Sequence, residues 1–475
     1  MRKTKIVCTL GPATEEKEIV RQMIRCGMNV ARLNFSHNTH EDHARRIQMI
    51  RELRQELETP IAILLDTKGP EIRLRDFEGG KVEIKKDQRF TLTTRDILGN
   101  TEEASITYTG LPQEISAGDV ILIDDGKLKL IVEEIEGTEI RCRVIHGGAV
   151  SNHKSINIPH VQLSIPYLSE QDKADLLFGI EQNVDFIAAS FTRSKDDIIA
   201  LRKFLNYNGG HDIRIIAKIE NIEGVDNFDD ILANSDGIMI ARGDMGVEIE
   251  YERLPGLQKQ FIRRCYQSGK MVITATQMLE SMVSNPTPTR AEITDVANAV
   301  FDGTSAIMLS GETAAGQYPV KAVQVMAKIA EQAENDALKL GSYEGFRYDM
   351  DTGVTNAMCD AACTTARDIK AKAIIALTKY GQTARRMSKF RPHMAIVAAT
   401  PVEKTYHQLA LSWGVYPVMA RYQRTSDELL QHAIDCARQI DAVEPGDRVV
   451  IAAGVPLDTS GNTNLLKVEI VGNRR

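Results

Sequence analysis

The chain has 475 residues, of which 43% are hydrophobic, and its formal net charge is −7. This length predicts two to four domains, and the composition is typical of a globular protein with a large core. The acidic balance argues against a nucleic-acid binder, although one local site can still be basic enough for an anionic substrate.

No apolar run in the sequence approaches the roughly 20 residues that cross a bilayer, and the first residues lack the pattern of a secretory signal. We therefore expect a cytoplasmic protein without a membrane partner. The seven cysteines are odd in number and scattered, which favours reduced, structural thiols over disulfides or a zinc site.

Short apolar, β-branched runs alternate with helix-period segments over the first two thirds of the chain, as in parallel strands buried on both faces. Two of the helix-period segments are Glu15–Arg25 and His40–Leu57, and a capping box at Thr289–Glu292 predicts another helix. Eight β/α units are the number in a TIM barrel. The eight predicted strands are Thr4–Leu10, Asn29–Phe35, Ile61–Thr67, Val184–Phe191, Arg214–Glu220, Gly237–Ala241, Met271–Thr276 and Ser305–Ser310.

More than 100 residues separate the third and fourth of these strands, and the pattern there changes to short alternating strands with glycine-rich turns. This predicts a small β-barrel lid domain inserted at residues 74–166, so that the barrel comprises residues 1–73 and 167–340. The predicted lid strands are Val82–Ile84, Arg89–Thr93, Val120–Asp124, Lys127–Ile135 and Glu139–Val144.

The last third of the chain predicts a separate domain. A helix at Pro319–Leu340 is followed by a polar linker at residues 341–353 and by a C-terminal α/β domain at residues 354–475. Alternation of strands and helices there indicates a mainly parallel sheet. Its predicted strands lie near Ala373–Thr378, Ala395–Thr400, Val415–Ala420, Arg448–Gly454 and Leu465–Gly472.

Polar side chains follow six of the eight predicted barrel strands, at the rim where TIM-barrel enzymes place their active sites. Four of these side chains are cations suited to phosphate and carboxylate groups: Arg32, Arg73, Lys218 and Arg242. Lys218 and Glu220 are two apart on one strand and therefore point to the same side.

Glu220 and Asp244 follow neighbouring strands and supply the hard oxygen ligands that Mg²⁺ or Mn²⁺ prefers. The alternative is that both carboxylates only pair with nearby Lys and Arg side chains. Gly243 lets the backbone approach a ligand closely, and a helical turn beginning at Gly243–Asp244 would bind an anion. The chain has neither a P-loop nor a G-x-G-x-x-G turn, so a nucleotide site must be built in another way.

These strand ends resemble the pyruvate kinase family, from near Thr4 to the C-terminus. The phrases that carry the resemblance are "TKIVCTLGPA", "ARLNFSH", "LDTKGPEIR", "KIEN", "ARGDMGVE", "ATQMLESM", "PTRAE" and "MLSGETAAG". The three-part layout is also similar to that family. The resemblance implies transfer of a phosphoryl group from phosphoenolpyruvate to ADP, the last step of glycolysis, in a bacterial-type enzyme without an extra C-terminal phosphohistidine-like domain.

The resemblance also implies roles for matching residues. Arg32 and Lys218 would bind the transferring phosphoryl group, and Lys218 would stabilise the enolate oxygen. Gly243, Asp244 and Thr276 would hold the substrate carboxylate, and Glu220 and Asp244 would hold Mg²⁺. The K⁺ ligands would be Asn34, Ser36, Asp66 and Thr67, and the nucleotide contacts would be Asn34, His37, Arg73 and Lys154.

Glu71 stands where a glutamate goes with K⁺ dependence in this family, so the resemblance predicts K⁺ dependence. Ser155 departs from the usual glycine beside Lys154. The donor of a proton to the enolate carbon stays open among Thr276, Ser310 and water.

The phrase "LTKYGQTA" resembles an effector phosphate loop, and a loop leading into a helix is suited to anions. Candidate effector residues are Thr378, Lys379, Gly381 and Thr383, with Ser460–Thr463 as a facing loop. Tyr380 and Gln382 depart from the serine and arginine of fructose-bisphosphate-responsive members, which favours a sugar or nucleotide monophosphate. The alternative is an ordinary helix start without a ligand.

Two rival functions stay open from the residues alone. A metal-dependent pyruvate or phosphoenolpyruvate lyase, or aldolase, would share the barrel and the carboxylate pair but would not need a K⁺ group or a lid. An inactive metabolite sensor would be expected to have lost Lys218 or a metal carboxylate, and all are present. The family resemblance further implies a homotetramer.

Overall fold

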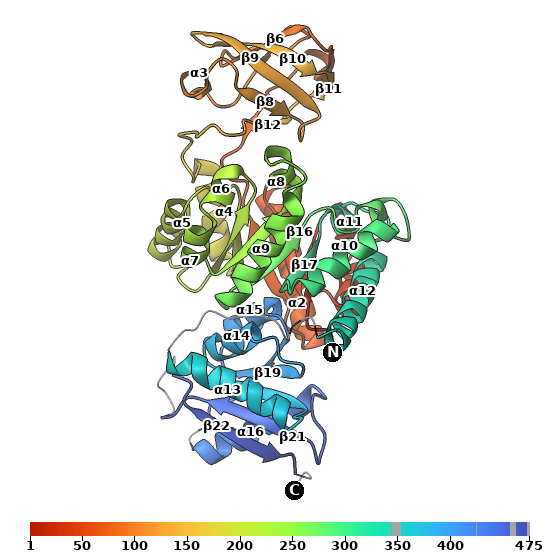
Figure 1. Ribbon diagram of the computed structural model, residues 1–475, viewed down its shortest axis with the longest axis vertical. Coiled ribbons are helices and arrows are strands. Elements are labelled where there is room, and N and C mark those ends of the chain that lie inside the picture. Colours follow the sequence, from red (N-terminus) through yellow and green to blue (C-terminus); the bar gives the residue numbers. More distant parts are fainter. Residues whose placement is uncertain (342, 344–352, 424, 457–461, 473–475) are drawn as a thin grey trace.

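The computed structural model describes residues 1–341, 343, 353–423, 425–456 and 462–472. Three parts follow one another along the long axis of the molecule: a β lid, a central barrel and a C-terminal α/β part (Figure 1). Among the described residues, no helix is long and apolar enough to cross a membrane.

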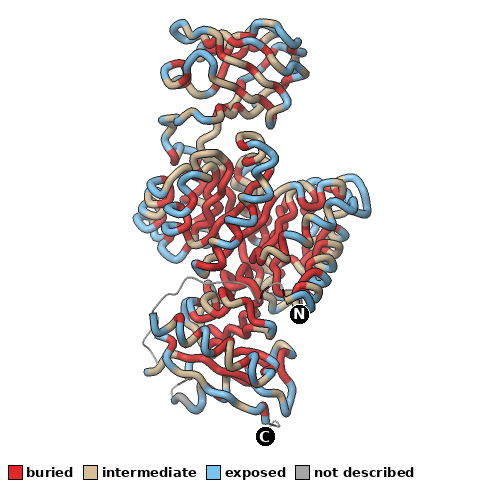
Figure 2. The backbone as a smooth tube through the Cα atoms, in the orientation of Figure 1, coloured by how far each residue is buried: buried red, intermediate tan, exposed pale blue. Residues whose placement is uncertain are grey.

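The central part is a closed barrel of eight parallel strands, and all eight strands predicted from the sequence are present. Their order around the barrel is β1-β17-β16-β15-β14-β13-β3-β2. Almost every strand residue is buried, which explains the continuous apolar runs (Figure 2). The strands are β1 (Lys5–Thr9), β2 (Val30–Asn34), β3 (Ala62–Asp66), β13 (Phe186–Ala189), β14 (Arg214–Ile219), β15 (Gly237–Ala241), β16 (Met271–Ala275) and β17 (Ala306–Leu309).

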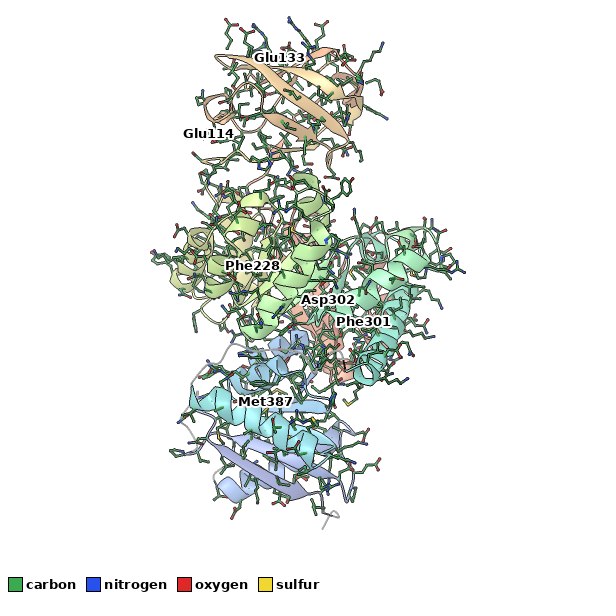
Figure 3. All side chains as sticks on the ribbon, in the orientation of Figure 1. Glu114, Glu133, Phe228, Phe301, Asp302 and Met387 are labelled. Atoms are coloured by element: carbon green, nitrogen blue, oxygen red, sulfur yellow. The ribbon has the colours of Figure 1, made fainter. Side chains whose placement is uncertain are left out.

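Helices surround the barrel, and local sequence signals set several of their ends. The predicted capping box is confirmed: the Thr289 hydroxyl accepts from the Glu292 amide, and the Glu292 carboxylate accepts from the Thr289 amide at 2.7 Å. Phe228 stacks on Phe261 with ring centroids 4.0 Å apart and so joins two helices (Figure 3).

The barrel helices are α1 (Lys17–Cys26), α2 (His40–Leu57), α4 (Glu170–Glu181), α5 (Lys195–Tyr207), α6 (Ile222–Asp226), α7 (Phe228–Asn234), α8 (Arg242–Glu248), α9 (Leu254–Gln267), α10 (Arg290–Phe301), α11 (Gly311–Ala314) and α12 (Pro319–Lys339), with short 3₁₀ turns η1 (Pro12–Thr14) and η3 (Glu280–Val283).

The lid is a curled half-barrel with its own apolar core. Seven strands form one sheet in the order β4-β12-β8-β9-β10-β6-β7, and β5 pairs with β11 in a second, two-stranded sheet. The sequence patterns missed the short strands β4, β7, β11 and β12, because two to four residues show no clear alternation. The lid elements are β4 (Ile72–Arg73), η2 (Glu78–Gly80), β5 (Lys81–Ile84), β6 (Arg89–Thr93), β7 (Glu103–Ser105), α3 (Leu111–Glu114), β8 (Val120–Ile123), β9 (Leu128–Glu136), β10 (Glu139–His146), β11 (Gly148–Ser151) and β12 (Ser155–Asn157).

The C-terminal part is a five-stranded sheet in the order β20-β19-β18-β21-β22, with β22 antiparallel at the edge. The mainly parallel sheet predicted from the sequence is therefore confirmed. Its elements are α13 (Val354–Asp368), β18 (Ala373–Leu377), α14 (Gln382–Lys389), β19 (Ala395–Thr400), α15 (Glu403–Gln408), η4 (Leu409–Leu411), β20 (Val415–Met419), α16 (Ser426–Gln439), β21 (Arg448–Ala453) and β22 (Leu465–Ile470).

The C-terminal part closes the end of the barrel that lies opposite the lid. Ala410 and Leu411 of η4 join the apolar cluster formed by the inward-facing strand residues. Lys5 of β1 donates to the Val415 carbonyl at 2.6 Å. The lid therefore faces the carboxyl ends of the strands, where the predicted site lies. The domain limits inferred from the sequence stay a prediction, and most of the predicted linker lies outside the described residues.

Candidate active site

A network of buried charges centred on Lys218 occupies the carboxyl ends of four barrel strands. The Lys218 ammonium lies 2.9 Å from Asp66 Oδ1, 2.7 Å from Ser190 Oγ and 3.1 Å from Glu220 Oε1. Arg32 donates from Nε to Asp66 Oδ2 at 2.6 Å. The parallel strands bring these side chains together from distant sequence positions, as the strand-end argument predicts.

The network fixes the charge of Lys218. Burial lowers the pKa of the ammonium, but the carboxylates of Asp66 and Glu220 outweigh burial and hold the pKa of Lys218 above its usual value. Lys218 therefore carries its positive charge at neutral pH, near the carboxyl end of β14. A fixed charge in a buried site stabilises a developing anion more strongly than it would in water.

Glu220 and Asp244 form the carboxylate pair expected to hold a divalent cation. Glu220 is almost fully buried, and its Oε2 accepts from the Phe191 amide at 2.6 Å. Burial, with the neighbouring charge of Asp244, raises the pKa of Glu220 to about 7, and burial also raises the pKa of Asp244. Two crowded carboxylates with raised pKa values are stabilised by a cation, so this donor set fits Mg²⁺ or Mn²⁺.

The start of α8 lies against the end of β16. The Gly243 amide donates to Thr276 Oγ1 at 2.8 Å, and Thr276 and Gln277 both have positive φ angles, of 67° and 54°. A Cβ added to Gly243 would lie 3.4 Å from Thr276 Oγ1, an ordinary van der Waals contact, so the space here does not itself require glycine. The predicted helical turn at Gly243–Asp244 is present.

Arg242 does not point into the rim as the sequence pattern suggested. Its Nη2 donates to the Thr276 carbonyl at 2.6 Å, and its Nη1 contacts Asp295 Oδ1 at 2.7 Å. The arginine is the first residue of α8, and that start turns its side chain toward α10. Arg242 therefore holds the strained backbone at Thr276 instead of presenting its charge to a phosphate.

The four predicted K⁺ ligands come from two adjacent strand ends. Asn34 and Asp66 are register partners in β2 and β3. The Asn34 side-chain oxygen accepts from the Ser36 amide at 3.1 Å, and Thr67 Oγ1 accepts from the Ser190 amide at 3.2 Å. Among the residues that the structure describes, no cluster of three or more His, Cys, Asp or Glu suits a metal ion. The predicted sites do not require one, because they combine fewer carboxylates with neutral oxygens.

A cleft of about 570 Å³ separates the lid from the rim. Of the predicted nucleotide contacts, His37, Arg73 and Lys154 line this cleft together with Asp244, whereas Asn34 is not among its described lining residues. Arg73 pairs with Glu71 at 2.7 Å, and Lys154 pairs with Asp124 at 2.8 Å. Cations from barrel and lid thus meet in one space next to the carboxylate pair.

Sequence reasoning missed three residues of the network. Ser190 bonds to both Lys218 and Asp66, Thr9 accepts from Arg32 Nη1 at 2.9 Å, and Asp295 holds Arg242. Ser190 and Thr9 stand at the ends of predicted strands, so the strand-end rule could have found them. Asp295 lies in mid-helix and carried no such signal.

Three of the four candidate effector residues line a separate cavity of about 310 Å³ in the C-terminal part. Thr378, Lys379 and Thr383 face it, and Thr383 Oγ1 lies 2.7 Å from Thr463 Oγ1. Gly381 caps α14 at φ 78°, a conformation that favours glycine. Of the facing loop, Asn462 and Thr463 line the cavity, and Ser460 and Gly461 lie outside the described residues.

Fold and rim together define a class of protein. The carboxyl end of a TIM barrel carries fixed cations and a carboxylate pair of the kind that binds metal ions. The lid above this end contributes further cations to the same cleft. Phosphoryl transfer depends mainly on positioning and charge neutralisation, which this arrangement supplies. The class is a TIM-barrel phosphotransferase.

Comparisons with known proteins identify the family. Residues 1–323 match the barrel domain of pyruvate kinase, and residues 356–469 match its alpha/beta domain. The chain is 49% identical to the pyruvate kinase of Clostridium acetobutylicum, over 99% of this chain and 100% of that protein. It is 47% identical to the pyruvate kinase of Staphylococcus haemolyticus, over 100% of this chain and 81% of that protein.

A solved pyruvate kinase from Cryptosporidium parvum matches with a TM-score of 0.91 at 40% identity, over 99% of this chain and 96% of that one. The chain belongs to the pyruvate kinase family. It transfers the phosphoryl group of phosphoenolpyruvate to ADP and yields pyruvate and ATP. This result favours the kinase over the lyase and the sensor that the residues alone left open.

Proposed function

We propose that Lys218 and Arg32 bind the transferring phosphoryl group and that Lys218 then stabilises the enolate oxygen left behind. The observation that carries this proposal is the Lys218 ammonium, held within 3.1 Å of Asp66, Ser190 and Glu220. The carboxylates keep Lys218 charged and fix its position, so little reorganisation is needed as negative charge develops.

Glu220 and Asp244 would hold the divalent cation, Mg²⁺ or Mn²⁺. When bound, such an ion neutralises phosphate and enolate charge. Asp244 also lies in the first turn of α8, and the Gly243 and Asp244 amides with the Thr276 hydroxyl would hold the substrate carboxylate. That role requires the Gly243–Thr276 bond of 2.8 Å to exchange for a bond to substrate.

K⁺ would be coordinated by oxygens of Asn34, Ser36, Asp66 and Thr67. Asp66 would place this ion next to the phosphoryl group, because it also contacts Lys218 and Arg32. Glu71, which pairs with Arg73, stands where the family resemblance predicts K⁺ dependence. Arg73, Lys154 and His37 would contact the nucleotide from the two sides of the lid cleft, with Asn34 nearby. Closure of the lid would exclude water, which otherwise competes for the phosphoryl group.

The cavity lined by Thr378, Lys379 and Thr383, with Gly381 as the N-cap of α14, would take a phosphorylated effector, because it combines a cation with the start of that helix. A homotetramer in the cytoplasm is part of the same proposal, and both rest on the family.

The metal assignment can be tested directly by Mn²⁺ titration followed by electron paramagnetic resonance. We expect Asp244→Asn to weaken Mn²⁺ binding at least about tenfold, since a charge-assisted ligand is lost. Glu223→Gln is the matched control, because Glu223 lines the same cleft outside the carboxylate pair. Equal Mn²⁺ affinity in the parent chain and Asp244→Asn would remove Asp244 from the metal site.

A further inference from the structure

A second basic cleft lies between the amino-terminal end of the barrel and the C-terminal part. Its volume is about 1200 Å³, and its described lining contains seven Lys and Arg side chains against two Asp. The whole chain carries a formal charge of −7, so this positive excess is local. A concave surface of one sign concentrates ions of the opposite sign.

Three arginines of this cleft, Arg202, Arg214 and Arg385, lie around one aspartate, Asp236. Both oxygens of Asp236 are used by barrel residues, at 2.5 Å from Arg202 and 2.8 Å from Arg214. Arg385 reaches the cleft from α14, and among the described residues its only hydrogen bond goes to the Tyr380 carbonyl, at 2.5 Å. Burial and the neighbouring charge of Arg214 lower the pKa of Arg385.

Two other cations of the cleft are satisfied by backbone carbonyls. Lys270 donates to Ala233, and Lys404 donates to Val184 and also lies 4.0 Å from Asp185 Oδ1. Carbonyl oxygens bear no net charge, so they satisfy the hydrogen bonds of Lys270 without neutralising its ammonium group. The described lining of the cleft therefore carries a net positive charge, which favours an anion.

Arg385 sits on a helix that is anchored on its other side. Met387 of α14 is fully buried in the core of the C-terminal part, where Figure 3 labels it. Arg214 begins β14, the strand that carries Lys218 at its other end. Arg385 and Arg214 thus present two guanidinium groups to the same cleft from two parts of the molecule.

The cleft and the candidate effector cavity share a wall. Tyr380 and Gln382 line both spaces, and the Tyr380 carbonyl is the partner of Arg385. An anion that draws Arg385 away from this carbonyl would alter the loop that precedes α14. Binding in one space would then change affinity in the other, and that coupling is reciprocal.

We propose that this cleft is a second anion site, for a small phosphorylated molecule held between Arg214 of the barrel and Arg385 of the C-terminal part. Guanidinium groups suit phosphate because they donate two parallel hydrogen bonds. The site joins the two parts of the molecule and acts on the effector loop through Tyr380. The proposal that the basic cleft binds an anion does not depend on whether the effector cavity binds a ligand. The proposed coupling between the cleft and the effector cavity does rest on the effector role proposed above.

The location can be tested in crystals of the full chain soaked in tungstate, a phosphate mimic that anomalous scattering detects. We expect a tungstate peak between Arg214 and Arg385, and loss of that peak in Arg385→Gln. Lys379→Gln is the matched control: it removes a cation from the effector cavity only, and should leave the peak in place. Peaks confined to the catalytic rim and the effector cavity would overturn the proposal.

Affinity is then measured in solution by equilibrium dialysis with radiolabelled inorganic phosphate. We expect Arg385→Gln to weaken one class of phosphate binding about tenfold, the effect of losing one charge-assisted contact. Its melting temperature and its turnover without phosphate should match those of the parent, because Arg385 lies far from the rim. Unchanged phosphate binding in Arg385→Gln, even with tungstate in the cleft, would mean an adventitious ion only and would refute the site.

Discussion

Two buried lysines lie at opposite ends of the barrel, and their surroundings differ in kind. Lys218 at the lid end contacts two carboxylates and a hydroxyl, whereas Lys5 at the other end contacts the Val415 carbonyl and lies 4.5 Å from the centre of the Tyr416 ring. Burial acts on both, yet the pKa of Lys218 lies above its usual value and the pKa of Lys5 is lowered to about 7.

The difference shows what each end of the barrel does. At the lid end, carboxylates keep Lys218 charged, although burial alone would favour its neutral amine. A buried charge maintained in this way is characteristic of a functional site. At the other end, η4 covers the strands with Ala410 and Leu411, and Lys5 is part of that closure. We therefore expect substitutions at the lid end to change turnover, and those at the other end to change stability.

After replacement of Lys218 itself, the largest effect is expected for Asp66→Asn. Asp66 orients both Lys218 and Arg32, so its charge loss releases two cations that the reaction needs. We expect kcat to fall about 100- to 1,000-fold, the range found when one stabilising group is lost from an active site. Steady-state assay of pyruvate formation measures this.

The matched control is Asp185→Asn, at a buried aspartate that pairs with Arg54 at 2.5 Å near the start of β13. It should lower the melting temperature and leave kcat within about threefold, as expected of a group that makes no transition-state contact. Equal losses of kcat in both variants would contradict the division between the two ends.

The next largest effect is expected at the end of the barrel opposite the lid, which η4 closes. Leu411 is fully buried among inward-facing strand residues. We expect Leu411→Ala to lower the free energy of unfolding by about 2–4 kcal/mol, because transfer and cavity costs add. Urea unfolding measures the change, and the kcat of the folded variant should stay near that of the parent. A stability loss below about 1 kcal/mol would show that η4 does not close the barrel core.

Removal of K⁺ should lower turnover less than Asp66→Asn does. We expect replacement of K⁺ by a large inert cation to lower kcat/KM about tenfold or more, the loss of roughly one charge-assisted contact. Glu71→Lys should reduce this dependence, as the family resemblance implies for a lysine at this position. Turnover that ignores K⁺ in the parent would remove the role of Asn34, Ser36, Asp66 and Thr67 as K⁺ ligands.

The smallest effect is a pH dependence of stability. The folded-state pKa of Lys5, about 7, is below that of an exposed lysine, so the unfolded chain binds more protons between the two values. Stability from this group therefore rises with pH above about 7, by at most about 1.4 kcal/mol per pH unit. Lys5→Met should remove this part of the slope in unfolding experiments between pH 7 and 9, and an unchanged slope would contradict it.

Sequence reasoning succeeded where one local rule decides the outcome. Continuous apolar runs gave all eight barrel strands, and the rule that barrel enzymes use carboxyl strand ends led to Lys218, Glu220 and Asp66 before any geometry was known. The same rule misjudged Arg242, because residue type does not tell which way a side chain leaves the first turn of a helix. The contacts to Thr276 and Asp295 decide that direction, and they exist only in the fold.

The missed lid strands have a comparable cause. β12 has three residues and pairs with β4 and β8, so long-range pairing creates it and local propensity does not. The basic cleft beside Arg385 was also invisible in the sequence, since its charges come from segments far apart in the chain. Tertiary contacts of this kind cannot be derived from periodicity alone.

The most direct test of the comparison is to measure kcat and the free energy of unfolding for Lys218→Met and Lys5→Met side by side. We expect Lys218→Met to lose about 1,000-fold or more in kcat while remaining folded. Lys5→Met should keep kcat within about threefold and change only stability and its pH dependence. A folded Lys5→Met variant that lost turnover as completely as Lys218→Met, or a Lys218→Met variant with near-normal turnover, would contradict the account.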